Sequence, residues 1–93
     1  MKRLEIIANK SVQDEILTGL ENTVADFYYT LIPVVHGRGK NDYKTGSAVW
    51  PEENFLAISY LDDKNAESAV RVIQEIKNRF PEEGIKFFLL KAE

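Results

Sequence analysis

A basic stretch in the middle of the chain carries the residue types best suited to hold an anion. Residues 34–41 read Val-Val-His-Gly-Arg-Gly-Lys-Asn. Glycines at alternate positions, here Gly37 and Gly39, let the backbone reach positive φ angles and present successive N–H groups to an anion. Arg38 and Lys40 can add charge-assisted hydrogen bonds to a phosphate or carboxylate. The stretch therefore predicts an anion site, with a solvated basic loop as the alternative.

Common phosphate-binding and RNA-binding motifs do not account for this stretch. It lacks the Gly-x4-Gly-Lys-Ser/Thr spacing of a P-loop. A dinucleotide-binding turn opens a helix, and we expect no helix directly after this stretch. It also lacks the aromatic pattern of an RNA-binding sheet. The chain has a net charge of −3, whereas surfaces that bind a phosphate backbone are usually basic. We therefore expect no nucleic-acid partner.

The loop that contains the basic run is long. We expect it to cover residues 37–53, whereas most connections have about 4–6 residues, and loops much longer than that usually have a function or are disordered. Lys44 would help to attract the anion, and Tyr43 and Trp50 would contact a partner. A solvated Tyr43 and a Trp50 that anchors the loop by packing are the alternatives.

A metal site and an enzyme are two further interpretations of the polar residues. The chain has one histidine, His36, and no cysteine, so a metal site would need carboxylates or His36 side chains from other copies. The candidate carboxylates are Asp42, Glu52 and Glu53. Asp62 and Asp63 form an acidic pair, but a helix N-terminus favours acidic residues without any catalytic role. No catalytic Ser/His/Asp or Cys/His arrangement is recognisable, and we expect a protein that is not an enzyme.

Hydrophobic periodicity predicts one domain, residues 1–93, with four strands and two helices. The strands are expected over residues 2–9, 25–36, 54–61 and 85–91, and the helices over residues 12–22 and between Asp62 and Pro81. This β-α-β-β-α-β order indicates a ferredoxin-like α+β sandwich. Right-handed crossovers would place both helices on one face of an antiparallel four-stranded sheet with strand order 4-1-3-2.

Single residues refine these expected elements. Ser11 offers an N-cap for the first helix, with Asp14 three residues later. Pro33 has no backbone N–H, so its strand should lie at a sheet edge or contain a bulge. The second helix should bury one apolar stripe. That stripe consists of Ala66, Ala69, Val70, Ile73, Ile76 and Phe80.

Apolar side chains are expected on both faces of the sheet. In the third strand Phe55 and Ala57 alternate with Leu56 and Ile58, so each face receives apolar residues. A continuous exposed apolar patch usually marks an interface. We therefore expect copies of the chain to assemble through the sheet face that lacks helices, with scattered exposed apolar residues as the alternative.

The chain resembles the PII signalling family of nitrogen regulatory proteins and its shorter PII-like relatives. The resemblance covers nearly the whole chain and rests on the strand and helix order, residues 34–41, Tyr43-Lys44, residues 54–60 and residues 84–90. Two differences from the family accompany it. Lys40 and Asn41 stand where the family loop has Arg and Gln. A brief acidic turn replaces the Gly-rich phosphate loop before the last strand, which leaves Gly84 and Lys86 as its counterparts.

The resemblance implies a homotrimeric, non-enzymatic regulator that binds a small anionic effector in clefts between subunits. An adenine nucleotide is the candidate effector. The long loop, called the T-loop in the family, would dock on a membrane transporter, an enzyme or a regulatory protein. The residues expected to contact the effector are His36, Gly37, Arg38, Gly39, Lys40, Asn41, Gly84 and Lys86. A CutA-like trimer that binds a divalent metal through His36 is the alternative function.

The location of the protein is inferred from what the sequence lacks. No apolar run approaches the roughly 18 residues that span a bilayer, and no signal peptide opens the chain. We therefore expect a soluble cytoplasmic protein.

Overall fold

The structure is a computed structural model, and it describes residues 1–37 and 53–93. It contains the elements β1 (Lys2–Asn9), the short 3-10 helix η1 (Lys10–Val12), α1 (Gln13–Thr23), β2 (Thr30–Val35), β3 (Asn54–Leu61), α2 (Asp63–Arg79) and β4 (Ile85–Lys91). The strands form one antiparallel sheet in the order β2-β3-β1-β4. The ferredoxin-like α+β fold and the strand order predicted from the sequence are confirmed.

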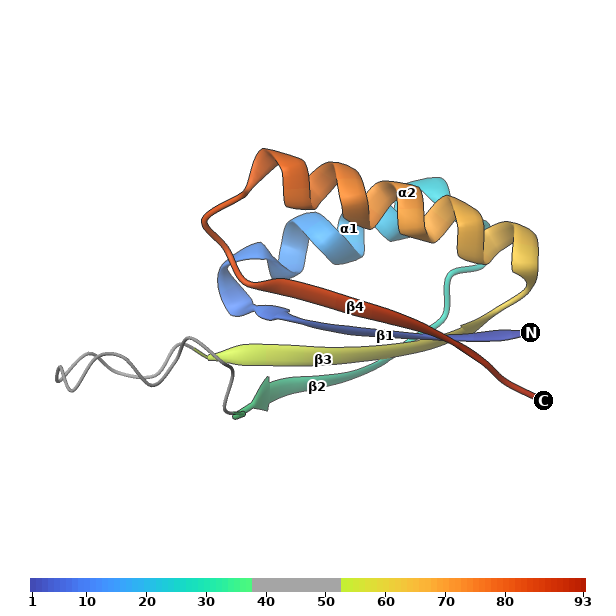
Figure 1. Ribbon diagram of the computed structural model, residues 1–93, viewed down its shortest axis with the longest axis horizontal. Coiled ribbons are helices and arrows are strands. Elements are labelled where there is room, and N and C mark those ends of the chain that lie inside the picture. Colours follow the sequence, from blue (N-terminus) through green and yellow to red (C-terminus); the bar gives the residue numbers. More distant parts are fainter. Residues whose placement is uncertain (38–52) are drawn as a thin grey trace, which may run out of the picture.

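Both helices cover the same face of the sheet, and the hydrophobic core lies between the two layers (Figure 1). The helix-facing residues of the two central strands are almost wholly buried, with Leu4, Ile6 and Phe55 each 0–1 % exposed. Gly19 lies where α1 meets α2, and a β-carbon there would stand 3.2 Å from Val72 Cγ1. The other face of the sheet carries no helix, and we call it the open face.

The second strand is shorter than the sequence predicts. The expectation of a strand over residues 25–36 is wrong at both ends, because β2 covers only Thr30–Val35. Asp26 adopts φ 52°, a left-handed conformation that short polar residues tolerate, and this turn buries Phe27 in the core instead of extending the strand. The prediction for Pro33 is confirmed twice, since β2 is an edge strand and its register shifts between Ile32 and Val35.

The start of the first helix also differs from the prediction. Ser11 is not the N-cap: Asn9 precedes a 3-10 turn, and its side chain accepts a hydrogen bond of 2.9 Å from the Ser11 backbone N–H. Asn9 ends β1, so its amide oxygen reaches the free N–H groups of the following turn. α1 then begins at Gln13, one residue later than expected.

The second helix follows its predicted stripe with one correction. Ala66, Ala69, Ile73 and Ile76 are buried as expected, but Val72 is buried where Val70 is only half-buried. The structure also gives Asp62, at the start of this helix, a capping role. Asp62 is the N-cap, and its Oδ1 accepts a hydrogen bond of 2.7 Å from the Asn65 backbone N–H.

None of the helices in residues 1–37 and 53–93 is long and apolar enough to cross a membrane.

Candidate functional site

One end of the sheet brings several sequence-predicted residues into register. Val35 of β2 pairs with Asn54 of β3, Asn54 pairs with Asn9 of β1, and the neighbouring Ala8 pairs with Ile85 of β4. His36 and Gly37 follow directly after this row, and Gly84 directly precedes it. The Gly84 carbonyl accepts a hydrogen bond of 2.9 Å from the Asn9 backbone N–H.

The two halves of the predicted effector site lie at opposite edges of this end. Gly37 continues from β2, whereas Gly84 and Lys86 belong to β4 and its preceding turn, and β3 and β1 lie between them. Three interstrand spacings of about 4.8 Å separate the two edges by about 14 Å. A single chain therefore does not bring Gly37 together with Gly84 and Lys86.

The glycines of this end do not need positive φ angles. A β-carbon at Gly37 or Gly84 would meet nothing within 4 Å, and neither residue lies in the left-handed region. Gly37 therefore does not adopt the positive φ angle expected of it, and because Gly39 lies outside the described residues, the anion site itself stays a prediction. The open space around both backbones leaves room for a ligand to approach closely.

The other residues of the predicted site divide into exposed and undescribed ones. His36 and Lys86 are exposed. Lys86 pairs in register with Ile7, so its side chain shares the open face with Ile7. Seven residues proposed for the effector or a partner fall outside the described residues, and these are Arg38, Gly39, Lys40, Asn41, Tyr43, Lys44 and Trp50.

The metal and acid-base interpretations gain no support from the described residues. No group of three or more His, Cys, Asp and Glu side chains lies close enough in residues 1–37 and 53–93 to hold a metal ion. Glu53 Oε2 lies 3.8 Å from Lys10 Nζ in an exposed ion pair. Asp42 and Glu52 lie outside the described residues, and Asp62 serves as the N-cap described above.

The open face is predominantly apolar, as the sequence predicts. Its side chains on the two central strands are half-buried by one another, and those on the outer strands and at the end of β3 are more exposed. Tyr60 is 54 % exposed, Phe88 49 % and Leu90 45 %. The apolar side chains of this face are Ile7, Ile32, Leu56, Ile58, Tyr60, Phe88 and Leu90. Apolar side chains of all four strands thus contribute to this face, with Arg3 and Glu5 of β1 between those of β3 and β4, and exposed apolar patches often mark an interface.

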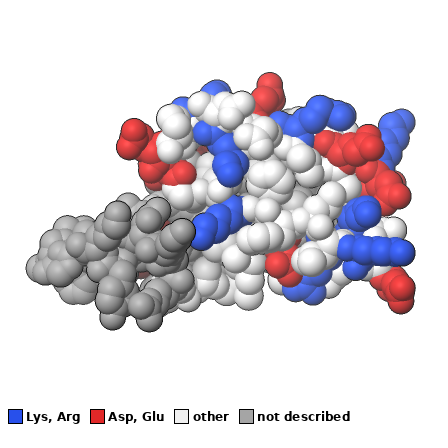
Figure 2. Space-filling view, viewed as in Figure 1, with Lys and Arg blue, Asp and Glu red and all other residues white. Residues whose placement is uncertain are grey.

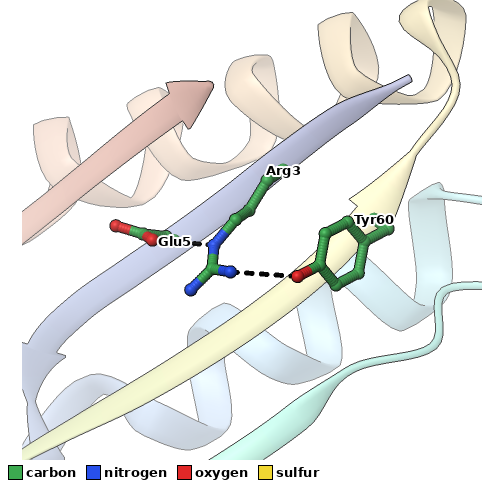
Figure 3. A network of polar contacts seen from close by, with 3 residues as sticks. All are labelled: Arg3, Glu5 and Tyr60. Atoms are coloured by element: carbon green, nitrogen blue, oxygen red, sulfur yellow. Dashed lines mark hydrogen bonds and ion pairs between the residues drawn. The ribbon is translucent and has the colours of Figure 1, made fainter. Parts of the chain in front are cut away.

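A polar cluster lies within this apolar face, and sequence reasoning did not single it out. Arg3 Nε donates a hydrogen bond of 2.8 Å to Glu5 Oε2, and Arg3 Nη1 donates one of 3.0 Å to the Tyr60 hydroxyl (Figure 3). The Arg3 guanidinium carbon also lies 5.8 Å from the centre of the Tyr60 ring. The hydrogen bond to Glu5 is the largest of the effects that raise the pKa of Arg3 above its ordinary value. Arg3 therefore remains a fixed positive charge on the open face.

Charge elsewhere on the described surface is mixed. On the face that Figure 2 shows, basic and acidic side chains of the described residues are interspersed along the molecule. This face offers no continuous basic area within the described part of the chain. Binding of an anion on the face shown would therefore depend on single cations of the described residues.

The sequence matches no protein-family model and no curated protein. Its fold, in contrast, matches solved structures. A PII-like signalling protein from Thermus thermophilus matches with TM-score 0.63 and 18 % identity, over 95 % of this chain and 82 % of that chain. The nitrogen regulatory PII-like protein CPII from Thiomonas intermedia, bound to ADP and bicarbonate, matches with TM-score 0.70 and 18 % identity, over 95 % of this chain and 81 % of that one.

A third match shows how far this likeness can be used. The de novo designed protein Foldit4 matches with TM-score 0.63 and 14 % identity, over 99 % of this chain and 98 % of the design. Identities this low show the fold, and a designed protein with the same fold carries no evidence of a natural function. The predicted structural likeness to PII-like signalling proteins is confirmed as a likeness of fold. Function has to be argued from the residues.

Proposed function

We propose that this chain is a PII-like regulator, without catalytic activity of its own, that forms a homotrimer and binds a small anionic effector between subunits. The observation that carries the proposal is the division of the candidate site. Gly37 and the loop after it leave one edge of the sheet, while Gly84 and Lys86 lie at the opposite edge of the same end. A second copy whose β4 edge lay beside the β2 edge of the first would complete such a site.

A closed ring of copies is the arrangement that would complete it in this proposal. In a two-fold dimer each contact between a residue i and a residue j occurs twice. In a closed ring of three or more copies every contact is head-to-tail. The β2 side of one copy would then meet the β4 side of the next, and Gly37 of one subunit would lie near Gly84 and Lys86 of its neighbour.

The open face supplies the reason for the ring to form. Tyr60, Phe88 and Leu90 are about half exposed in the single chain, and covering them would remove apolar area from water at roughly 25 cal/mol per Å². A chain of 93 residues buries only about 60–65 % of its unfolded surface, so assembly would add substantially to its stability.

The effector we propose is an adenine nucleotide. CPII, which shares the fold, was solved with ADP and bicarbonate and with ADP, AMP and bicarbonate. In this chain the cations available for the phosphates would be Lys86 and the loop residues Arg38, Lys40 and Lys44. The loop would carry the signal by changing its surface when the effector binds, with Tyr43 and Trp50 contacting a transporter or regulatory protein.

Isothermal titration of the full chain with ADP, AMP, ATP, cyclic AMP and bicarbonate tests this proposal. We expect heat of binding with at least one nucleotide. Lys86→Gln should weaken that binding about tenfold, because a charge-assisted hydrogen bond contributes about 1.5–3 kcal/mol. Lys91→Gln is the matched control, since Lys91 lies on the same strand at the opposite end of the sheet, and it should bind as the unchanged chain does. The absence of heat with every nucleotide would overturn the nucleotide assignment.

A further inference from the structure

The Arg3–Glu5–Tyr60 cluster places opposite charges in the middle of an apolar surface. Glu5 stands in register between Ile58 of β3 and Phe88 of β4. Arg3 stands in the neighbouring row, between Tyr60 and Leu90 (Figure 3). If the face only had to exclude water, apolar side chains would serve better at both positions, since desolvating an ion pair is costly.

The cluster is only partly satisfied and partly covered within one chain. Two N–H groups of Arg3 contact Glu5 and Tyr60, and a guanidinium has five to offer. Glu5 uses Oε2 for Arg3, and its side chain is 26 % exposed, against 36 % for Arg3. Both groups therefore keep bonding capacity that faces outward from the open face.

We propose that Arg3 and Glu5 fix the register and the number of copies in the assembly, through contacts between Arg3 of one copy and Glu5 of the next. This inference rests on the proposed function, because it takes a second copy of this chain as the occupant of the open face. A rotation axis makes the pair self-complementary: each copy presents one positive and one negative group, so opposite charges can meet around the axis.

The surrounding apolar residues cannot supply this selectivity. Contacts among Ile58, Phe88 and Leu90 are non-directional, so a slipped or enlarged assembly would bury similar apolar area. A slipped arrangement would bury the Arg3–Glu5 pair of each chain without the additional partners that the neighbouring copy supplies, and desolvating an ion pair is costly. Polar groups within an apolar interface are known to select one register and one oligomer in this way.

Native mass spectrometry and sedimentation velocity of Glu5→Gln, Arg3→Met/Glu5→Leu and a control test the inference. Glu5→Gln leaves Arg3 without its carboxylate, and we expect the dissociation constant of the assembly to rise at least tenfold. The double variant removes both charges, so it should associate again, but as a mixture of oligomers. The control is Glu67→Gln, which changes an exposed carboxylate of α2 on the helix-covered side of the sheet, and it should behave as the unchanged chain does.

The outcomes separate this inference from the proposal beneath it. If the unchanged chain assembles and Glu5→Gln assembles equally well, the inference is overturned and the trimer stands. A double variant that forms a single species with the original number of copies also overturns the selective role of the pair. If the unchanged chain stays a single copy at every concentration, the proposed function fails first, and the inference fails with it.

Discussion

The helix-covered face and the open face of the sheet both carry large apolar side chains, but only those of the covered face are buried within one chain. On the helix-covered face, Leu4, Ile6 and Phe55 are fully buried within one chain. On the open face, Phe88 and Leu90 are about half exposed, although they are as apolar. An antiparallel sheet with one solvated face normally alternates apolar and polar residues along its strands. β3 and β4 lack that alternation, which supports the proposal that a second copy covers the open face.

The polar content of the two faces separates them further. The covered face holds one buried polar residue of the central strands, Ser59, whose hydroxyl donates a hydrogen bond of 2.6 Å to the Tyr28 carbonyl. The open face holds a full ion pair, Arg3–Glu5. Within one chain, the loops that connect the strands and helices help to align the elements that form the core. Separate copies have no such covalent connection, and a charged pair can align them instead.

Phe55→Ala should give the largest effect and is confined to the covered face. Phe55 is fully buried, and truncation of such a phenylalanine costs about 3–5 kcal/mol of unfolding free energy. Because the core lies within one chain, the loss should be the same at low and high protein concentration. Urea unfolding at two concentrations tests this, and a loss that shrinks at high concentration would contradict it.

Phe88→Ala makes the same chemical change on the open face. Phe88 is half exposed in the single chain, so unfolding of the dissociated chain should change little. Association should weaken by about 1–2 kcal/mol, roughly tenfold in dissociation constant, as for a central interface side chain. Sedimentation velocity over a dilution series measures the change. An assembly of unchanged affinity would mean that the open face is not the interface.

Gly19→Ala tests the packing between α1 and α2, the two helices that cover one face of the sheet. Alanine favours a helix interior over glycine by about 0.8–1 kcal/mol. The added β-carbon, however, would lie 3.2 Å from Val72 Cγ1 and 3.4 Å from Ile76 Cδ1, and overpacking typically costs about 1–3 kcal/mol. We expect a net destabilisation of about 1 kcal/mol by urea unfolding.

The packing explanation for Gly19 has its own control. In a Val72→Ala background the crowding at 3.2 Å is relieved, so Gly19→Ala should lose its penalty there. A double-mutant cycle measures that difference. If Gly19→Ala instead stabilises the otherwise unchanged chain by about 0.8–1 kcal/mol, the full preference of alanine over glycine in a helix, then the packing of α1 on α2 does not require a glycine at position 19.

Tyr29→Phe should give the smallest effect, and only in alkaline solution. Partial burial, followed by the charge of Glu21, raises the pKa of Tyr29 above its ordinary value of 10.0. The folded chain thus holds the Tyr29 proton more tightly than the unfolded chain. The contribution of this hydroxyl to the unfolding free energy is fully present below about pH 10 and is lost as the pH rises through the pKa of Tyr29 in the folded chain. Tyr29→Phe should therefore lose less stability than the unchanged chain above about pH 10.

Thermal unfolding on both sides of about pH 10 measures the Tyr29 effect. Tyr28→Phe is the matched control, because the neighbouring Tyr28 side chain is 76 % exposed, and it should follow the unchanged chain across the series. Identical alkaline profiles for Tyr29→Phe and the unchanged chain would exclude a contribution from this hydroxyl.

Regular elements could be predicted from the sequence because their signals are local. The bounds of β1, β3 and β4 agree with the predicted strands, since turn residues flank these apolar runs in the sequence. The predicted element bounds are wrong where contacts between distant parts of the chain determine the local conformation. Phe27 leaves the predicted strand to fill the core, and the Asn9 side chain displaces Ser11 as the cap because the strand end places it beside the turn.

The candidate site was less accessible to sequence reasoning. The loop glycine Gly37 and the pair Gly84 and Lys86 could be identified as candidates, but their placement at opposite edges depends on the paired strands. Arg3 and Glu5 alternate with Leu4 and Ile6 along β1, a pattern that a strand with one solvated face also shows. The signal that could have identified them was available, because their neighbours on β3 and β4 are apolar on that same face.

Sedimentation equilibrium of the unchanged chain at micromolar concentration tests the central claim most directly. If the open face is an interface between copies, the measured mass should be three times the chain mass of 10.7 kDa. A mass of 10.7 kDa at every concentration would contradict the account, because the apolar open face would then be stable in water and the divided effector site would remain incomplete.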